Sequence, residues 1–247
     1  MTAQMAIWEE ALTVRACRHD SAVPVADGKA APKLKPETYR VGPLDKGTAN
    51  EMVVRHHYLH RKPNVSHCFG LFGENGDVLG AVTFGTPASR HLQQGMCPSD
   101  PGKVIELNRL WVHDSCPTNT ESFFVARALH ALPPLLVVSY ADTAWGHDGT
   151  IYRALNFNYA GWTDMDRKTA RYDYIPPDGL HTRDSFRDGE PKWTHRVRRK
   201  PKAKYWIATG NRRERKLLER ACAWPSIDWN VYPVPTQHTH LVLRESV

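Results

Sequence analysis

The spacing of apolar and polar residues divides the chain into alternating strand-like and helix-like segments. The run TYRVG at 38–42 predicts a short strand. After Pro43, apolar residues recur at helical spacing in KGTANEMVVRHHYL, where Thr48 or Asn50 is a suitable N-cap. In HCFGLFGENGDVLGAVTFG, two β-rich runs flank Asn75-Gly76, a dipeptide typical of tight hairpins. These patterns predict a strand, a helix and a hairpin.

The second half of the chain continues this alternation. LLVVSYAD is a near-continuous apolar run, as expected of a strand that is buried on both faces. Asn156 is suited to the left-handed position that ends a helix. We expect strands in KVIELNRLWV, LLVVSYAD, AGW, TARYDYI, KYWIA and HLVLR, and helices in SFFVARALHAL, GTIYRALNFNY and the basic segment 211–220.

This order of elements predicts an α/β fold, a mixed β-sheet flanked by helices, and it resembles the GNAT acyltransferase fold. The resemblance is carried by a central strand, a turn that opens a helix, a buried strand, and a helix with Tyr152 and Phe157 near its end. We expect a flexible N-terminal arm at 1–35 with a short helix near 8–15, a GNAT-like catalytic domain at 36–210, and a basic helix and C-terminal tail at 211–247.

The GNAT resemblance implies that the turn after the central strand binds a cofactor phosphate. In that fold the turn is normally rich in glycine, which lets backbone N–H groups approach a pyrophosphate. The corresponding segment here, Cys116 to Ser122, contains no glycine, and Glu121 would oppose a phosphate. The side chains that could still hold one are those of Thr118, Asn119, Thr120 and Ser122.

Charge and cysteine content narrow the functional classes. The 247 residues have a net charge of +7, and residues 183–220 contain 14 lysines and arginines against 5 acidic residues. Such a basic block suggests a polyanionic partner, although a solvated surface would look the same. No apolar run suits a membrane span and no secretory signal is visible. The five cysteines form no CxxC pair, which argues against a disulfide framework, a zinc ribbon or a zinc deaminase and favours a reducing cytoplasm.

Three segments carry the candidate chemistry: HHYLHR from residue 56, ELNRLW from residue 106, and SYAD from residue 139, which is followed by His147 and by GTIY from residue 149. In this order they resemble the Mom family of bacteriophage DNA-modification proteins. The resemblance covers roughly residues 39–165 and implies conversion of adenine in DNA to N6-carbamoylmethyladenine, which blocks host restriction enzymes. By motif, it places the functional positions on His57, Tyr58, Asp142 and Tyr152.

These residue types suit that chemistry. The N6 amine of adenine is a weak nucleophile, so a base must remove a proton as the new bond forms. Asp142 could be that base or could anchor the amine, and it could equally cap the loop that follows it. Tyr152 could be the general acid for the leaving group, or an aromatic residue that packs on the sheet. His57 and Tyr58 could hold an adenine that has been flipped out of the duplex.

For two further candidate sites, the residues alone allow more than one interpretation. Arg109 could clamp a phosphate or carboxylate of the cofactor, or it could pair with Glu106 or Asp114. His56 and His60 are four residues apart and would share a helix face, where they could bind a metal. The family resemblance implies that iron could be required. The simpler interpretation is a cluster of histidines that are exposed or already hydrogen-bonded.

The basic block mixes cations with aromatic residues, a pattern that suits a DNA backbone and an unstacked base. We therefore expect double-stranded DNA as the partner and no membrane. The candidate DNA-binding residues are Arg198, Arg199, Lys200, Lys202, Lys204, Tyr205 and Trp206.

The donor of the transferred group is the main chemical question. Acetyl transfer joins N6 to a carbonyl carbon, whereas a carbamoylmethyl group joins N6 to a CH2. The donor is therefore either an acyl-CoA or a glycine-derived small molecule or aminoacyl compound. The alternatives are a conventional GNAT acetyltransferase, which leaves the basic block unexplained, and a DNA-binding module without catalysis, which leaves Asp142 and Tyr152 unexplained. A methyltransferase is disfavoured because no glycine-rich cofactor loop is visible.

Overall fold

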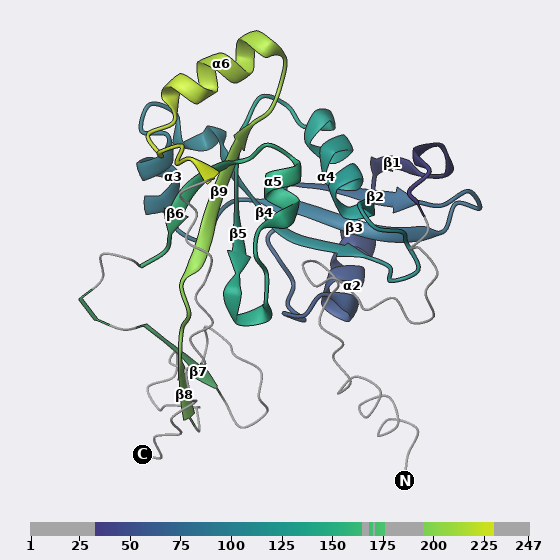
Figure 1. The fold of residues 1–247 in the computed structure, drawn as a ribbon, viewed down its shortest axis with the longest axis horizontal. Helices are drawn as coiled ribbons and strands as arrows, with labels where there is room; N and C mark the ends of the chain where they lie inside the picture. The colour runs from purple at the N-terminus through teal and green to yellow at the C-terminus, as the bar shows by residue number, and fades with distance from the viewer. Residues whose placement is uncertain (1–32, 165–167, 170, 176–194, 230–247) are drawn as a thin grey trace.

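A seven-stranded mixed β-sheet flanked by helices forms the centre of the protein (Figure 1). The computed structural model describes residues 33–164, 168, 169, 171–175 and 195–229. The expected fold class is therefore confirmed. Residues 1–32 of the arm expected at 1–35, the helix expected near Trp8 and the strand HLVLR lie outside the described residues. None of the described helices has the length and apolar character needed to cross a bilayer.

The strands follow the order β1-β2-β3-β4-β5-β9-β6, and a separate two-stranded sheet pairs β7 with β8. Only β4 and β5 are parallel neighbours within the seven-stranded sheet. The strands are β1 Arg40–Pro43, β2 His67–Phe72, β3 Val78–Gly85, β4 Val104–Val112, β5 Leu136–Asp142, β6 Asn158–Trp162, β7 Tyr172–Ile175, β8 His195–Arg198 and β9 Lys202–Ala208.

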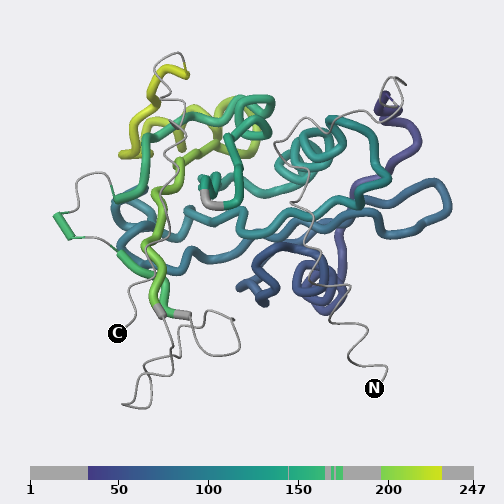
Figure 2. Tube along the Cα trace, turned by 60° about the horizontal axis from the view of Figure 1, so that its bottom comes forward, coloured from purple at the N-terminus to yellow at the C-terminus, as the bar shows by residue number. Residues whose placement is uncertain are grey.

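Helices cover both faces of the sheet, and Figure 2 shows α2 and α4 on opposite sides. A large apolar core that includes Phe124, Val137 and Tyr205 lies under α4 and beside α5. A second cluster joins Met96 of α3 and Leu218 of α6 to the opposite face of β5 and β9. The helices are α2 Lys46–His56, α3 Arg90–Met96, α4 Thr120–Ala131, α5 Thr150–Ala154 and α6 Arg212–Ala221, with 3-10 turns η1 Pro36–Thr38, η2 Pro101–Lys103 and η3 Thr143–Trp145.

Local sequence explains several element boundaries. Asp45 caps α2, because its side chain accepts a hydrogen bond from the Thr48 N–H at 3.0 Å, so the expected cap at Thr48 or Asn50 was wrong. Gly76 has φ +84° in the turn between β2 and β3, which confirms the hairpin. Asn211 and Glu214 form a capping box at the start of α6, the basic helix that the sequence predicts.

Other elements differ from the expectation. The helix expected over 149–159 is shorter, because Asn156 takes φ +57° and Asn158 already begins β6. The sequence pattern missed α3, a helix of seven residues, and β8, a strand of four residues with the sequence HRVR. Both elements are too short to show a helical or strand-like repeat of apolar residues in the sequence.

Candidate functional site

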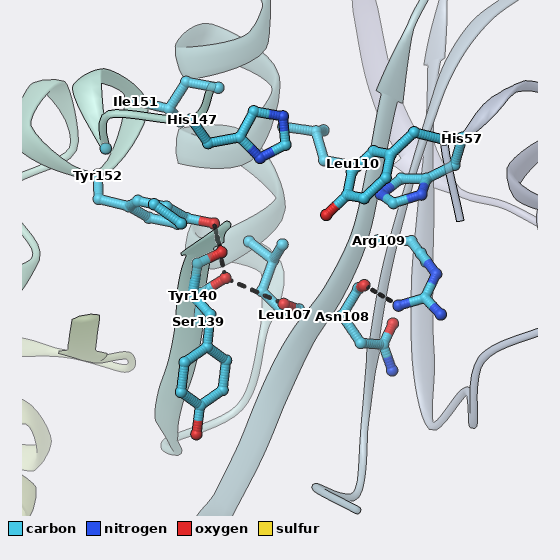
Figure 3. Close-up of a pocket in the computed structure, with 13 residues that line it drawn as sticks. His57, Leu107, Asn108, Arg109, Leu110, Ser139, Tyr140, His147, Ile151 and Tyr152 are labelled. Carbon is cyan, nitrogen blue, oxygen red and sulfur yellow. Dashed lines mark hydrogen bonds between the residues drawn. The ribbon is translucent and has the colours of Figure 1, made fainter. Parts of the chain in front are cut away.

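The candidate site opens where β4 and β5 separate. These parallel strands pair at only three positions, from Val104–Leu136 to Glu106–Val138. Beyond them, the Ser139 hydroxyl donates to the Leu107 carbonyl at 3.0 Å and takes the place of the next backbone rung. A pocket occupies the gap and contains about 510 Å³ of empty space, part of it open to solvent (Figure 3).

A β-bulge shapes the β4 side of the pocket. Thr83 pairs with Arg109 and Phe84 with Leu107, so Asn108 is the extra residue. The Asn108 amide accepts from the Thr83 hydroxyl at 2.6 Å and donates to the Asn64 carbonyl at 2.8 Å. These bonds fix the bulge against the segment that follows α2.

The end of α5 positions Tyr152. The Phe157 N–H donates to the Tyr152 carbonyl at 2.9 Å and the Asn156 N–H to the Arg153 carbonyl at 3.1 Å, which together form a Schellman motif. The Tyr152 and Phe157 rings are 5.3 Å apart, the apolar contact that usually accompanies this motif. The left-handed Asn156 that the sequence predicts is therefore confirmed, and it helps to orient Tyr152.

The Tyr152 ring stacks on Tyr205 at 4.5 Å and its hydroxyl points into the gap between the strands (Figure 3). This hydroxyl lies 2.8 Å from the Ser139 hydroxyl and 3.3 Å from the Tyr140 carbonyl. Because Ser139 uses its own proton on Leu107, the single Tyr152 proton has two acceptors within reach, Ser139 and Tyr140. These two contacts hold the Tyr152 hydroxyl in the gap between the strands.

His57 and Tyr58 enter the pocket from the end of α2. The His57 ring is buried, and its Nδ1 accepts the Leu59 N–H at 3.1 Å. A neutral His57 therefore carries its proton on Nε2 and can donate a hydrogen bond from that atom. The Tyr58 ring lies between His57 at 4.2 Å and Trp145 at 4.7 Å, with His147 at 5.2 Å. These four rings are called the aromatic row here: His57, Tyr58 and His147 line the pocket, and Trp145 adjoins it through Tyr58.

Asp142 lies at the end of β5, beside the pocket, and is not among the residues that line it. Its carboxylate forms an ion pair with Lys202 at 2.5 Å, and its side chain is 9% exposed. The next residue, Thr143, donates to the Pro201 carbonyl at 2.9 Å. The end of β5 is thus tied to the start of β9.

Arg109 lines the pocket from the central strand. It donates to the Asn108 carbonyl at 2.5 Å, and its buried Nε has no hydrogen-bond partner. Burial lowers the pKa of Arg109, while Tyr58 and Glu106 act in the opposite direction. The guanidinium still remains charged at any ordinary pH, so Arg109 provides a partly buried positive charge.

The turn expected to bind a cofactor phosphate leads into α4 beyond the carboxyl end of β4. Asn119 has φ +72° at the N-cap position. The Thr120 hydroxyl donates to Pro117 at 2.6 Å and the Ser122 hydroxyl to Asn119 at 3.0 Å, so both are engaged within the turn. Thr118 is exposed. None of the four expected residues lines the pocket described above.

The structure separates the candidate DNA-binding residues. Tyr205 is fully buried and Trp206 is 4% exposed, so the expected stacking of these rings on a DNA base was wrong. They are consecutive residues of the internal strand β9, so their side chains point to opposite faces and pack into the two cores. Lys202 pairs with Asp142, and Lys204 lies over the Trp224 ring.

The remaining three candidates lie at the end of β8 or directly after it. Arg198 and Lys200 are exposed, whereas Arg199 forms an ion pair with Asp173.

The expected metal site was also wrong in its geometry. The helix α2 ends at His56, so His60 does not share a helix face with it. His56 stacks on Trp111 at 4.4 Å, and His60 Nδ1 lies 2.9 Å from the Val54 carbonyl. Within the described part of the chain, no three histidine, cysteine or acidic side chains are grouped to hold a metal. These donors do not fit an iron site.

Sequence reasoning gave no role to two residues of this site. Trp145 is 43% exposed on η3 and contacts Tyr58, and Ser139 holds the Tyr152 hydroxyl. The sequence did contain one signal for Trp145: it is a tryptophan in the short loop that follows a strand predicted to be buried. The contacts of Ser139 depend on the separation of β4 from β5, and no sequence pattern predicts that separation.

Comparison with known proteins places this site in a family. The model of the Mom protein family matches residues 38–218. Methylcarbamoylase mom of Escherichia phage Mu is 30% identical over 129 residues, which cover 49% of this chain and 53% of that protein. The match therefore spans about half the length of this curated relative.

Two of the solved acetyltransferases that resemble the chain share 10% identity with it. Phosphinothricin acetyltransferase of the GNAT superfamily from Sinorhizobium meliloti, in complex with AcCoA, aligns with a TM-score of 0.40 over 70% of this chain and 89% of its own. Ribosomal-protein-S5-alanine acetyltransferase from Vibrio fischeri aligns with a TM-score of 0.40 over 74% and 98%. Because the family model matches well over half of its residues, the chain belongs to the Mom protein family.

Proposed function

We propose that this protein is a DNA-modifying transferase that converts adenine in double-stranded DNA to N6-carbamoylmethyladenine and thereby protects that DNA from restriction. Membership of the Mom family and the likeness to a methylcarbamoylase support this proposal. The observation that carries it is the pocket between β4 and β5, which combines a row of aromatic rings with the Tyr152–Ser139 hydroxyl pair.

The aromatic row suits a purine. An enzyme that acts on a base in duplex DNA must extrude it, and extruded bases are held by stacking and by hydrogen bonds to their polar edge. Tyr58 offers a ring face, and the Nε2–H of neutral His57 offers a donor. Trp145, exposed beside Tyr58, is placed to contact the duplex from which the adenine leaves.

The polar groups suit the transfer step. The N6 amine loses a proton as its bond to the donor carbon forms, and we assign that proton to Asp142, which could also anchor the amine. The leaving group gains a proton from Tyr152, which Ser139 adjoins. Asp142 lies beside the pocket rather than in it, so its role requires the adenine to enter next to the Lys202 ion pair.

The donor is a glycine-derived compound, or an acyl-CoA whose CH2 carbon rather than its thioester carbonyl becomes bonded to N6. Acetyl-CoA alone cannot provide the CH2–CONH2 group, since N6 would become attached to a carbonyl carbon. Arg109 is positioned to hold a carboxylate or phosphate of the donor in the pocket. The first turn of α4, with Thr118, Asn119, Thr120 and Ser122, would offer its backbone N–H groups to a phosphate.

The test is mass spectrometry of nucleosides from plasmid DNA of cells that express the protein, with Asp142→Ala as the control. We expect an adenosine derivative that carries CH2CONH2 in place of one hydrogen, and its loss in the variant. Unmodified DNA in cells with soluble, folded protein would refute the proposal. A product formed from purified protein, DNA and acetyl-CoA alone would refute the proposed donor class.

A further inference from the structure

The two strands β7 and β8 form a ribbon that projects from the main sheet (Figure 1). Their antiparallel register places Tyr172 opposite Arg198 and Tyr174 opposite Arg196. Side chains alternate between the two faces of a strand, so these four residues share one face. The opposite face has the pair Asp173 and Val197.

The two faces differ in chemistry. On the first, Arg196 and Arg198 are exposed and Tyr172 and Tyr174 are partly buried, with the Arg196 guanidinium 4.5 Å from the centre of the Tyr172 ring. On the second, the Asp173 carboxylate is neutralised by Arg199 and Val197 is 40% exposed. Only the first face combines cations with aromatic rings, the combination that contacts nucleic acid backbones and bases.

The base of the ribbon is joined to the mouth of the pocket. The Arg199 N–H donates to the Arg171 carbonyl at 2.8 Å, and two residues later Pro201 accepts from Thr143 of η3. The same η3 carries Trp145, which touches Tyr58 in the pocket. The ribbon therefore starts beside the aromatic row.

The other basic element lies elsewhere. Helix α6 exposes the cations of Arg212, Arg213, Arg215, Lys216 and Arg220. Figure 1 shows α6 and the ribbon at opposite ends of the molecule, with the carboxyl end of β5 toward the ribbon. The basic block of the sequence is thus divided into two separate surfaces.

We propose that the face of the β7–β8 ribbon formed by Tyr172, Tyr174, Arg196 and Arg198 binds the DNA duplex next to the pocket, and that α6 does not contact this duplex. A two-stranded β-ribbon fits the major groove, and its arginines can reach phosphates or base edges there. The inference rests on the proposed function, because it names the surface that delivers adenine to the same pocket.

Charge-removing variants with matched controls test the ribbon. The variant R196Q/R198Q removes two cations from the proposed face. The variant R198Q/K200Q removes two exposed cations without removing a described contact, which keeps the test valid if loss of the Arg196–Tyr172 contact unfolds the ribbon. The control R212Q/R213Q removes two exposed cations from α6. Binding of each full-length variant to a labelled DNA duplex is measured over a salt titration.

We expect both ribbon variants to weaken binding by about tenfold or more near physiological salt and to lower the slope of log K against log salt by about 2, while the α6 variant stays within about twofold of wild type. An equal loss in the α6 variant, or wild-type slopes in the ribbon variants, would overturn the ribbon assignment. The nucleoside analysis separates this from the proposed function. Modified adenine in wild-type cells together with unaffected ribbon variants refutes only the ribbon, whereas unmodified DNA refutes the function itself.

Discussion

Asp142 is the residue whose role depends most on its neighbour. Its carboxylate contacts Lys202, so a substitution could stop proton removal or could release the start of β9. As a base, Asp142 is worth about 10²–10⁴-fold in rate. We therefore expect Asp142→Asn to abolish most DNA modification, measured as the fraction of modified adenine, and Lys202→Met to lower it by less than about tenfold. Equal losses in the two variants would show that the ion pair serves only to position the strand.

The Tyr152 hydroxyl can be removed without disturbing its ring. Tyr152→Phe keeps the stack on Tyr205 and the contact with Phe157 but loses the bond to Ser139. We expect a loss of modification of about 10²–10⁴-fold, with a stability cost of only about 1 kcal/mol. Tyr205→Phe, in the same stack, is the matched control and should modify DNA at close to the wild-type level. Near-normal activity of Tyr152→Phe would remove this tyrosine from the proton transfer.

His56 provides a pH-dependent contribution to stability. Although the residue as a whole is exposed, its ring stacks on Trp111, and this partial desolvation lowers the pKa of His56 from 6.5, with further contributions from Arg55, His113 and His60. The folded protein then binds fewer protons at this site than the unfolded chain. The contribution is present above about pH 6.5 and is lost as the pH falls through the lowered pKa. We expect denaturant midpoints at about pH 7.5 and about pH 5.5 to differ less in His56→Gln than in the wild type. The same pH dependence in both proteins would contradict this assignment.

At the scale of elements, the turn into α5 depends on a single glycine. Gly149 has φ +87°, and a Cβ there would lie 2.1 Å from the Tyr205 hydroxyl. Gly149→Ala should therefore cost about 1–3 kcal/mol of unfolding free energy and displace Tyr152 from Ser139. Thermal unfolding measures the cost. Gly95→Ala in α3 is the control, because a Cβ at Gly95 meets nothing within 4 Å, and it should be neutral or slightly stabilising.

The elements also show which features a sequence can reveal. Strong local signals, such as the Asn75-Gly76 turn and the left-handed Asn156, predicted boundaries that the structure confirms. The stacking role expected of Tyr205 and Trp206 was wrong, because these consecutive residues of an internal strand point to the two cores. Whether a strand is internal depends on long-range pairing, which a local pattern does not contain.

The candidate site shows the same limit. The motifs gave the residues that face the pocket, including His57, Tyr58 and Tyr152. They did not reveal that β4 and β5 separate after three pairs, and this separation is what creates the cavity. The ion pair of Asp142 with Lys202 joins residues 60 positions apart and was equally hidden. Local chemistry could be predicted, whereas the contacts that place it could not.

At the scale of the whole molecule, the segment after β9 is part of the same packed body as the pocket. Leu218 of α6 lies in the second core, and the Ile227 N–H donates to the Tyr159 carbonyl at 2.8 Å. The Trp229 ring stacks on Tyr205 at 5.3 Å, and Tyr205 stacks in turn on Tyr152. A continuous series of rings therefore connects the C-terminal segment to the proposed acid.

This connection predicts the outcome of two truncations. A chain that ends after Gly210 loses α6 and Trp229, which exposes apolar side chains of β5 and β9 and leaves Tyr205 without one stacking partner. Removal of one large buried aromatic alone typically costs about 3–5 kcal/mol, so this chain should melt at a much lower temperature, bind an apolar dye and modify no DNA. A chain that ends after Trp229 retains all of these contacts and should melt well above the chain that ends after Gly210. A stable, dye-negative chain ending at Gly210 would show that the sheet and pocket stand without the C-terminal segment.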